Sequence, residues 1–82
     1  MIPTKATAIE DIARAREMAR TGRAEEILRE ADVSCPEVAQ VIGVDPSTVW
    51  LWCKGKARPT GERAVRFVRC LDRLEKRKRV GP

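Results

Sequence analysis

Apolar residues recur at helical spacing along most of the chain. Between Thr7 and Arg20, isoleucines and alanines are separated by charged residues, a pattern typical of a surface helix with a narrow apolar stripe. Thr21 and Gly22 interrupt the pattern, and a second amphipathic segment follows, with apolar residues at positions i, i+3, i+4 and i+7: Ala24, Ile27, Leu28 and Ala31. The first part of the chain therefore predicts two helices.

Ser34 carries the start signals of a third helix. Glu37, three residues later, completes a capping box, and Pro36 fits the first helical turn. Gly43 ends this helix, because glycine adopts a positive φ at little cost where the chain must turn. The predicted third helix is therefore short.

A fourth helix is predicted to follow almost at once. Asp45 is a good N-cap, Pro46 fits the first helical position, and the helix should run to about Lys54. A basic loop at 56–59 leads to Thr60 and a last helix, whose apolar residues again keep helical spacing: Ala64, Phe67, Val68, Leu71 and Leu74. No segment alternates with the period of a strand, so we expect an all-α, compact bundle of five to six short helices.

Residues 34–54 form the most informative unit, two short helices joined by a tight turn. Ala39 allows the two helices to approach closely, Val44 and Val49 fill the gap between them, and Trp52 closes the far end. The second helix is then held at a fixed angle and has a width that the major groove of DNA admits. Its predicted outward face consists of Asp45, Pro46, Ser47, Trp50, Leu51 and Lys54.

This unit resembles the helix-turn-helix of the lambda-repressor, Cro and XRE-like regulators, especially small actinobacterial and phage members. The resemblance covers about residues 22–74 and depends on a set of short matches: Val38-Ala39, Ile42-Gly43-Val44, Ser47-Thr48-Val49, Trp52, Gly55-Lys56 and Arg58-Pro59-Thr60-Gly61-Glu62. It implies a five-helix bundle in which 45–53 is the recognition helix and the preceding helix braces the phosphates. We therefore expect one DNA-binding domain over 1–82, with an additional N-terminal helix (1–21), a core (22–75) and a basic tail (76–82).

The predicted DNA contacts lie on the two helices of this unit and on the loop that follows: Ser34, Asp45, Pro46, Ser47, Thr48, Trp50, Leu51, Lys54, Lys56 and Arg58. Members of the family often carry glutamine where this chain has Cys35 and Pro46, and a polar or basic residue where it has Leu51. Bidentate readout of bases by glutamine or arginine is therefore lost at those positions. We expect contacts with thymine methyl groups, phosphate anchoring and shape readout instead.

The two tryptophans of the fourth helix lie on different faces. Trp52 shares a helical face with Val49 and is predicted to be a core residue. Trp50 lies about 200° from Trp52 around the helix and cannot share that face. An exposed tryptophan usually marks a contact, and three readings stay open: DNA, a protein interface, or packing under the N-terminal helix.

Charge is distributed unevenly along the chain. The net charge is +5; residues 1–33 hold 6 basic and 7 acidic residues, whereas residues 34–82 hold 11 basic and 5 acidic residues. A positive field of this kind suits a polyanion, and counterion release makes nucleic acid its natural target. Lys54, Lys56 and Arg58 are predicted phosphate contacts, while the run 76–79 fits either DNA contact or a helix end that complements the dipole.

Several absences count against an enzyme. The chain has no histidine, and therefore lacks the usual general base near neutral pH and the commonest metal ligand. The three cysteines, Cys35, Cys53 and Cys70, form no C-x-x-C pair and are expected to be small, semi-buried apolar side chains, with a redox switch as the minor alternative. We expect no cofactor, metal or small-molecule ligand. No long apolar run occurs, so we expect no membrane partner and a cytoplasmic location, in bacteria or from a phage gene.

The leading hypothesis is a sequence-specific transcriptional regulator that binds operator DNA as a homodimer or as adjacent subunits. One alternative is an architectural, excisionase-like factor that bends or coats DNA. Another is an antitoxin-like or adaptor module in which Trp50 and Leu51 contact a protein. A dimer would be held together by the last helix, through Val65 and Cys70, or by the N-terminal helix.

Overall fold

Five α-helices form the part of the chain that the structure describes. A computed structural model describes the backbone of residues 5–80 and the side-chain surroundings of residues 8–77. The helices are α1 (Lys5–Thr21), α2 (Arg23–Ala31), α3 (Cys35–Ile42), α4 (Pro46–Cys53) and α5 (Gly61–Val80). No strand occurs between residues 5 and 80. The predicted all-α class is therefore confirmed.

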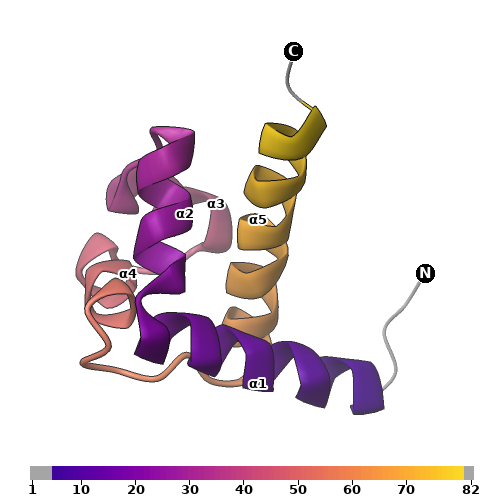
Figure 1. Ribbon diagram of the computed structural model, residues 1–82. Coiled ribbons are helices and arrows are strands. Elements are labelled where there is room, and N and C mark those ends of the chain that lie inside the picture. The colour runs from indigo at the N-terminus through magenta and orange to yellow at the C-terminus, as the bar shows by residue number, and fades with distance from the viewer. Residues whose placement is uncertain (1–4, 81–82) are drawn as a thin grey trace.

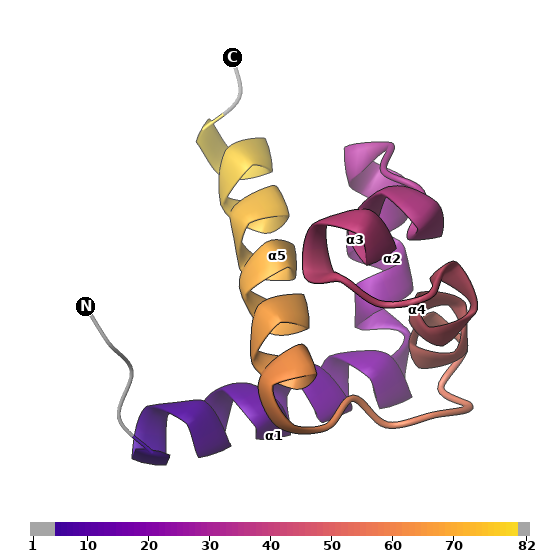
Figure 2. The same cartoon turned by 180° about the vertical axis from the view of Figure 1, so that it is seen from behind.

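The helix α1 runs along one end of the molecule, and the other helices lie on one side of it (Figure 1). Both α2 and α5 rise from α1, and the reverse view in Figure 2 shows α3 in front of α2, and α4 on the side of α2 away from the N-terminus. A loop after α4 runs back along α1 to the start of α5 (Figures 1 and 2). No helix between residues 5 and 80 has both the length and the apolar character needed to cross a membrane.

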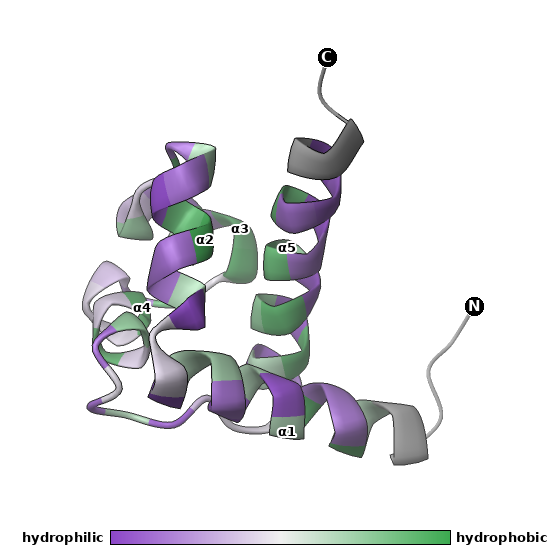
Figure 3. Cartoon of the chain, in the orientation of Figure 1, coloured by the Kyte–Doolittle hydropathy of each residue, from purple (hydrophilic) through white to green (hydrophobic). Residues whose placement is uncertain are grey.

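Every helix contributes to one hydrophobic core. The apolar residues of α2, α3 and α5 face the interior (Figure 3). The buried residues are Ala15, Ala19, Ala24, Ile27, Leu28, Val38, Ala39, Ile42, Val49, Trp52, Cys53, Ala64, Phe67, Val68 and Leu71. The predicted stripe of the last helix is thus confirmed at four of its five positions, and Leu74 packs on the edge of the core.

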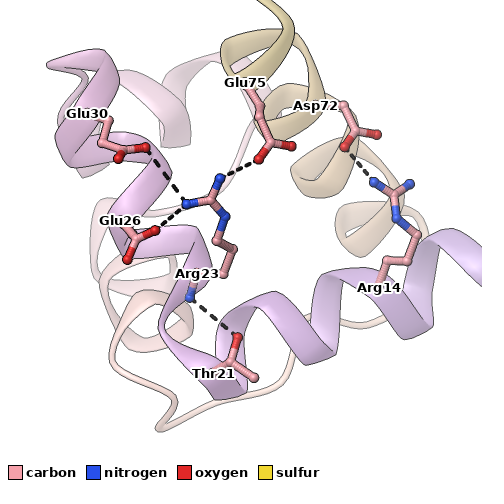
Figure 4. A network of polar contacts seen from close by, with 7 residues as sticks. All are labelled: Arg14, Thr21, Arg23, Glu26, Glu30, Asp72 and Glu75. Atoms are coloured by element: carbon pink, nitrogen blue, oxygen red, sulfur yellow. Dashed lines mark hydrogen bonds and ion pairs between the residues drawn. The ribbon is translucent and has the colours of Figure 1, made fainter. Parts of the chain in front are cut away.

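The N-terminal helix is part of this core. Ala15 and Ala19 of α1 are 0% and 3% exposed, and such small side chains let α1 approach its neighbours closely. Arg14 of α1 also bonds Asp72 of α5 at 2.5 Å (Figure 4). Although 1–21 was expected as an addition to the core, α1 contributes buried residues to the bundle.

The turn between α3 and α4 follows the predicted local rules. The Glu37 backbone N–H donates to Ser34 Oγ at 3.4 Å, and the Ser34 N–H donates to the Glu37 carboxylate at 3.0 Å, which completes the capping box. Gly43 has φ 89° and ψ 40°, and its N–H bonds the Ala39 carbonyl at 2.8 Å. Asp45 is the N-cap residue of α4, but its side chain makes no capping hydrogen bond.

The C-terminal basic run 76–79 lies at the end of α5, which continues to Val80, and this agrees with the reading of the run as a helix end. The backbone of 76–80 is therefore helical, and the side chains of Lys76 and Arg77 are exposed. The side chains of Lys78 and Arg79 lie outside the described residues.

The space around Gly43 changes the expected effect of a substitution there. A tight turn between two helices predicts a clash for a β-branched side chain such as valine, but a Cβ built on Gly43 meets no atom within 4 Å. Only the positive φ of 89° opposes a side chain. Since the left-handed conformation costs an ordinary residue about 1–2 kcal/mol, the penalty comes from the backbone and not from packing.

This conformation predicts a ranked series of stabilities. Gly43→Asn should be the mildest change because asparagine tolerates the left-handed region, Gly43→Ala should cost about 1–2 kcal/mol, and Gly43→Val should cost more because its β-branch is penalised there. Urea unfolding measures all three free energies of unfolding. A valine variant as stable as the wild-type protein would contradict the positive-φ turn.

Candidate nucleic-acid interface

α4 has one buried face and one exposed face. Val49, Trp52 and Cys53 are 0%, 3% and 3% exposed, respectively. Of the ten predicted contact residues, eight are exposed and two are half-buried. The exposed residues are Ser34, Asp45, Pro46, Ser47, Trp50, Lys54, Lys56 and Arg58, and the half-buried ones are Thr48 and Leu51. The predicted outward face is therefore largely accessible, and Leu51 presents only part of its side chain.

Trp52 anchors α4 to the rest of the bundle. Its ring packs against Phe67 of α5, with 4.8 Å between the ring centroids and 47° between the planes. Aromatic pairs at this separation stabilise a fold beyond the area that they bury. The core position predicted for Trp52 is confirmed, and it fixes which face of α4 points outward.

Trp50 lies on the outer side of α4 between two cations. It is 45% exposed, and its ring centroid is 6.0 Å from Lys54 Nζ and 5.5 Å from Lys56 Nζ. Both distances permit cation–π attraction. Trp50 also borders a shallow groove of about 300 Å³ with residues of α2 and of the start of α3, so the reading in which it packs under the N-terminal helix is wrong.

That groove brings the two ends of the helix-turn-helix to one surface. Its lining consists of Glu25, Leu28, Arg29, Val33, Ser34, Cys35, Trp50, Cys53 and Lys54. Ser34 marks the start of α3, and Lys54 the end of α4. The Ser34 hydroxyl donates to the Glu37 carboxylate at 2.8 Å, so it is already engaged in the cap.

Two of the cysteines meet beside this groove. Burial raises the pKa of the Cys53 thiol to about 12, and the neighbouring Cys35 thiol adds to the increase. Cys35 and Cys70 are half-buried, and burial also raises the pKa of Cys70. The expectation of small, semi-buried side chains is confirmed. Their spacing of 18 positions gave no sign that Cys35 and Cys53 lie close together.

Lys54 has an acidic partner that the sequence did not reveal. Its Nζ bonds the Glu25 carboxylate of α2 at 2.8 Å. This hydrogen bond is the main reason that the pKa of Glu25 falls below its usual value. The two residues are 29 positions apart, so only the packing of α2 against α4 brings them together. In the unbound protein Lys54 is therefore a paired cation.

Other cations around α4 have no acidic partner within the described residues. Lys56 and Arg58 lie in the loop that leaves α4, and Arg20 lies in the last turn of α1. Arg63 of α5 borders a hollow of about 380 Å³ beside the first turn of α4, together with Gly43, Val44, Asp45 and Thr48. Sequence reasoning missed Arg20 and Arg63, because the side of a helix that faces α4 depends on long-range packing.

On the other side of the bundle, arginines are neutralised by carboxylates. Arg23 bonds Glu26 and Glu75 and lies 3.8 Å from Glu30, which ties α2 to α5 (Figure 4). Surface pairs of this kind add little stability, but they remove charge from that face. Unpaired positive charge is therefore found beside α4 and on the outer part of α5, where Arg73, Lys76 and Arg77 are exposed.

Comparisons of the chain with protein-family models, with curated proteins and with solved structures found no match. The resemblance to lambda-repressor, Cro and XRE-like regulators therefore stays a prediction from the residues that carry it. Three features of the structure bear on the function: the two-faced helix α4, its exposed tryptophan and the flanking cations.

Proposed function

We propose that this protein binds double-stranded DNA in a sequence-specific manner, as a transcriptional regulator of the phage repressor or Cro type, with α4 in the major groove. The observation that supports it best is the two-faced character of α4. Its inner face is fixed in the core by Val49 and Trp52, and its outer face is exposed between unpaired basic side chains.

The dimensions of α4 suit the major groove. An α-helix with its side chains is about 10–12 Å across, and the major groove is about 12 Å wide, so the groove admits α4. Because the buried face is immobilised, the helix enters the groove without first being ordered, and little conformational entropy is lost on binding.

The outer face offers few side chains that read bases by paired hydrogen bonds. Ser47 supplies one hydroxyl, whereas Trp50 and the exposed part of Leu51 supply apolar surface. Apolar groups distinguish thymine through its methyl group, and the shape of the duplex adds discrimination at bases that the protein does not touch. We infer that the preferred site is rich in A·T pairs.

Phosphates would be held by the cations that flank α4. Lys56 and Arg58 can reach a phosphate without breaking an ion pair, whereas Lys54 must first separate from the Glu25 carboxylate. Two copies of the chain on half-sites about 34 Å apart would give the affinity that one small helix-turn-helix lacks. Val65 and Cys70 are half-buried and Ile9 is 66% exposed, so α1 offers the larger accessible apolar group for such pairing.

Trp50→Ala tests the role of the exposed tryptophan. Because Trp50 lies off the core, the free energy of unfolding should hardly change, while specific DNA binding should weaken by about 1–3 kcal/mol. Non-specific affinity should stay the same. Val41→Ala removes another exposed apolar side chain, 76% exposed on α3, and is the matched control that should bind as the wild-type protein does.

Tryptophan fluorescence reports the same contact directly. Trp52 is buried, so addition of a duplex selected from a random pool should change only the Trp50 signal. A Trp52→Phe variant should keep the response, and a Trp50→Phe variant should lose it. Full operator affinity in Trp50→Ala, together with loss of self-association, would instead assign Trp50 to a protein interface. Strong bending of the duplex by several adjacent subunits would favour the architectural alternative.

Glu25→Gln tests whether the Glu25–Lys54 pair competes with DNA. Removing the carboxylate frees Lys54 for a phosphate, so DNA affinity at low salt should rise by up to about fivefold, the range of an exposed ion pair. Glu62→Gln removes the same charge from the partner of Arg66 and is the control. Equal gains in both variants would show that only net charge matters, and Lys54→Ala in the Glu25→Gln background should abolish the gain.

A further inference from the structure

A second groove lies between α1 and the loop that follows α4. It has a volume of about 650 Å³ and is lined by Ala13, Arg16, Glu17, Ala19, Arg20, Gly55, Ala57 and Arg58. The loop runs beside α1 in both views of the molecule (Figures 1 and 2). The groove therefore begins where α4 ends and extends along the last turns of α1.

The walls of this groove are held together by two close contacts. Gly55 has φ +69°, and a Cβ at this position would lie 3.4 Å from the carbonyl oxygen of Ala19, so the loop leaves α4 directly against α1. At the other end of the loop, Arg16 Nε donates to the carbonyl oxygen of Pro59 at 3.1 Å, and Pro59 is buried. Both ends of the loop are therefore fixed, and the groove exists before any ligand binds.

The groove is positively charged. Arg16, Arg20 and Arg58 line it, and Glu17 is the one acidic residue in the lining. The C-terminal ends of α1 and α4 each add a partial negative charge of roughly half a unit. The positive charge of the three guanidinium groups is larger than this sum. The bond to Pro59 occupies only the Nε of Arg16, and Arg20 and Arg58 form no ion pair with the described acidic residues.

The chemistry of the lining selects a small, strongly anionic group. Its apolar members are alanines (Ala13, Ala19 and Ala57), which form no pocket that could hold the large side chains by which peptides anchor. Guanidinium groups present planar pairs of N–H donors that match the oxygens of a phosphate. A phosphate group therefore fits this lining better than an acidic peptide does.

We propose that this groove binds a phosphate of the DNA backbone beside the major groove that receives α4, which makes α1 an additional DNA-contacting helix. The proposal rests on the proposed function. A helix in the major groove has a phosphate backbone along each side, so cations beside the helix can reach phosphates that the helix itself does not. Arg58 belongs to both surfaces, and Arg16 and Arg20 extend the contact.

The salt dependence of binding gives the first test, with Arg20→Ala as the variant and Arg73→Ala as the matched control. Arg73 is exposed and lies about 180° around α5 from the buried Ala64, so it points away from the bundle. For Arg20→Ala the slope of log K against log salt should become shallower by about 0.9, the loss of one phosphate contact. Arg73→Ala should keep the wild-type slope, and both variants should keep the wild-type melting temperature.

A scan of the bound duplex with single neutral methylphosphonates locates the contact. At one position outside the segment that α4 occupies, the substitution should weaken binding of the wild-type protein and of Arg73→Ala severalfold, but leave Arg20→Ala unaffected. A scan of Arg20→Ala identical to that of the wild-type protein would overturn the proposal. Inorganic phosphate is then added to the protein without DNA, and the NMR signals of the arginine Nε–Hε groups in the groove are followed. If these signals shift to a saturable limit, the site would be one for free anions.

The two proposals fail in different ways. If the wild-type chain binds no duplex above the level of bulk electrostatic attraction, the proposed function fails and the groove proposal falls with it. The other outcome is that the wild-type chain binds a selected duplex and Trp50→Ala weakens that binding. If Arg20→Ala then shows the same salt slope and the same methylphosphonate scan as the wild-type protein, only the groove proposal is overturned.

Discussion

The packing of Trp52 against Phe67 is the contact on which the presentation of α4 depends. The two rings lie 4.8 Å apart in the core, and Trp52 is 3% exposed. Once this face is buried, the geometry of the helix turns Trp50 outward by about 200°, whatever the rest of the surface does. A short helix with a weak preference for its own structure is thereby given one fixed orientation.

Electrostatics then distinguishes one side of the bundle from the other. Arg14 and Arg23 are neutralised by carboxylates of α2 and α5, while Lys56 and Arg58 have no such partner. Lys54 is intermediate, because Glu25 holds it at 2.8 Å until a competing anion arrives. The same packing that buries Ala19 of α1 places Arg20 beside the loop, so core and charged surface are set by one arrangement of helices.

Much of the fold could be predicted from the sequence, because its signals are local. The capping box at Ser34, the turn at Gly43 and the core face of Trp52 each depend on residues a few positions apart. The pairing of Lys54 with Glu25 and the meeting of Cys35 with Cys53 depend on contacts across the bundle, which no periodicity encodes. The outward face of the candidate site was thus predictable, whereas its partners were not.

Amide chemical-shift mapping with a duplex selected from a random pool tests the central claim, that α4 binds DNA, most directly. The account predicts that the largest shifts fall on residues 46–58, with smaller ones on the last turn of α1, and that the outer face of α5 around Arg73 stays unchanged. Shifts confined to α5, or no duplex retained by selection, would contradict it.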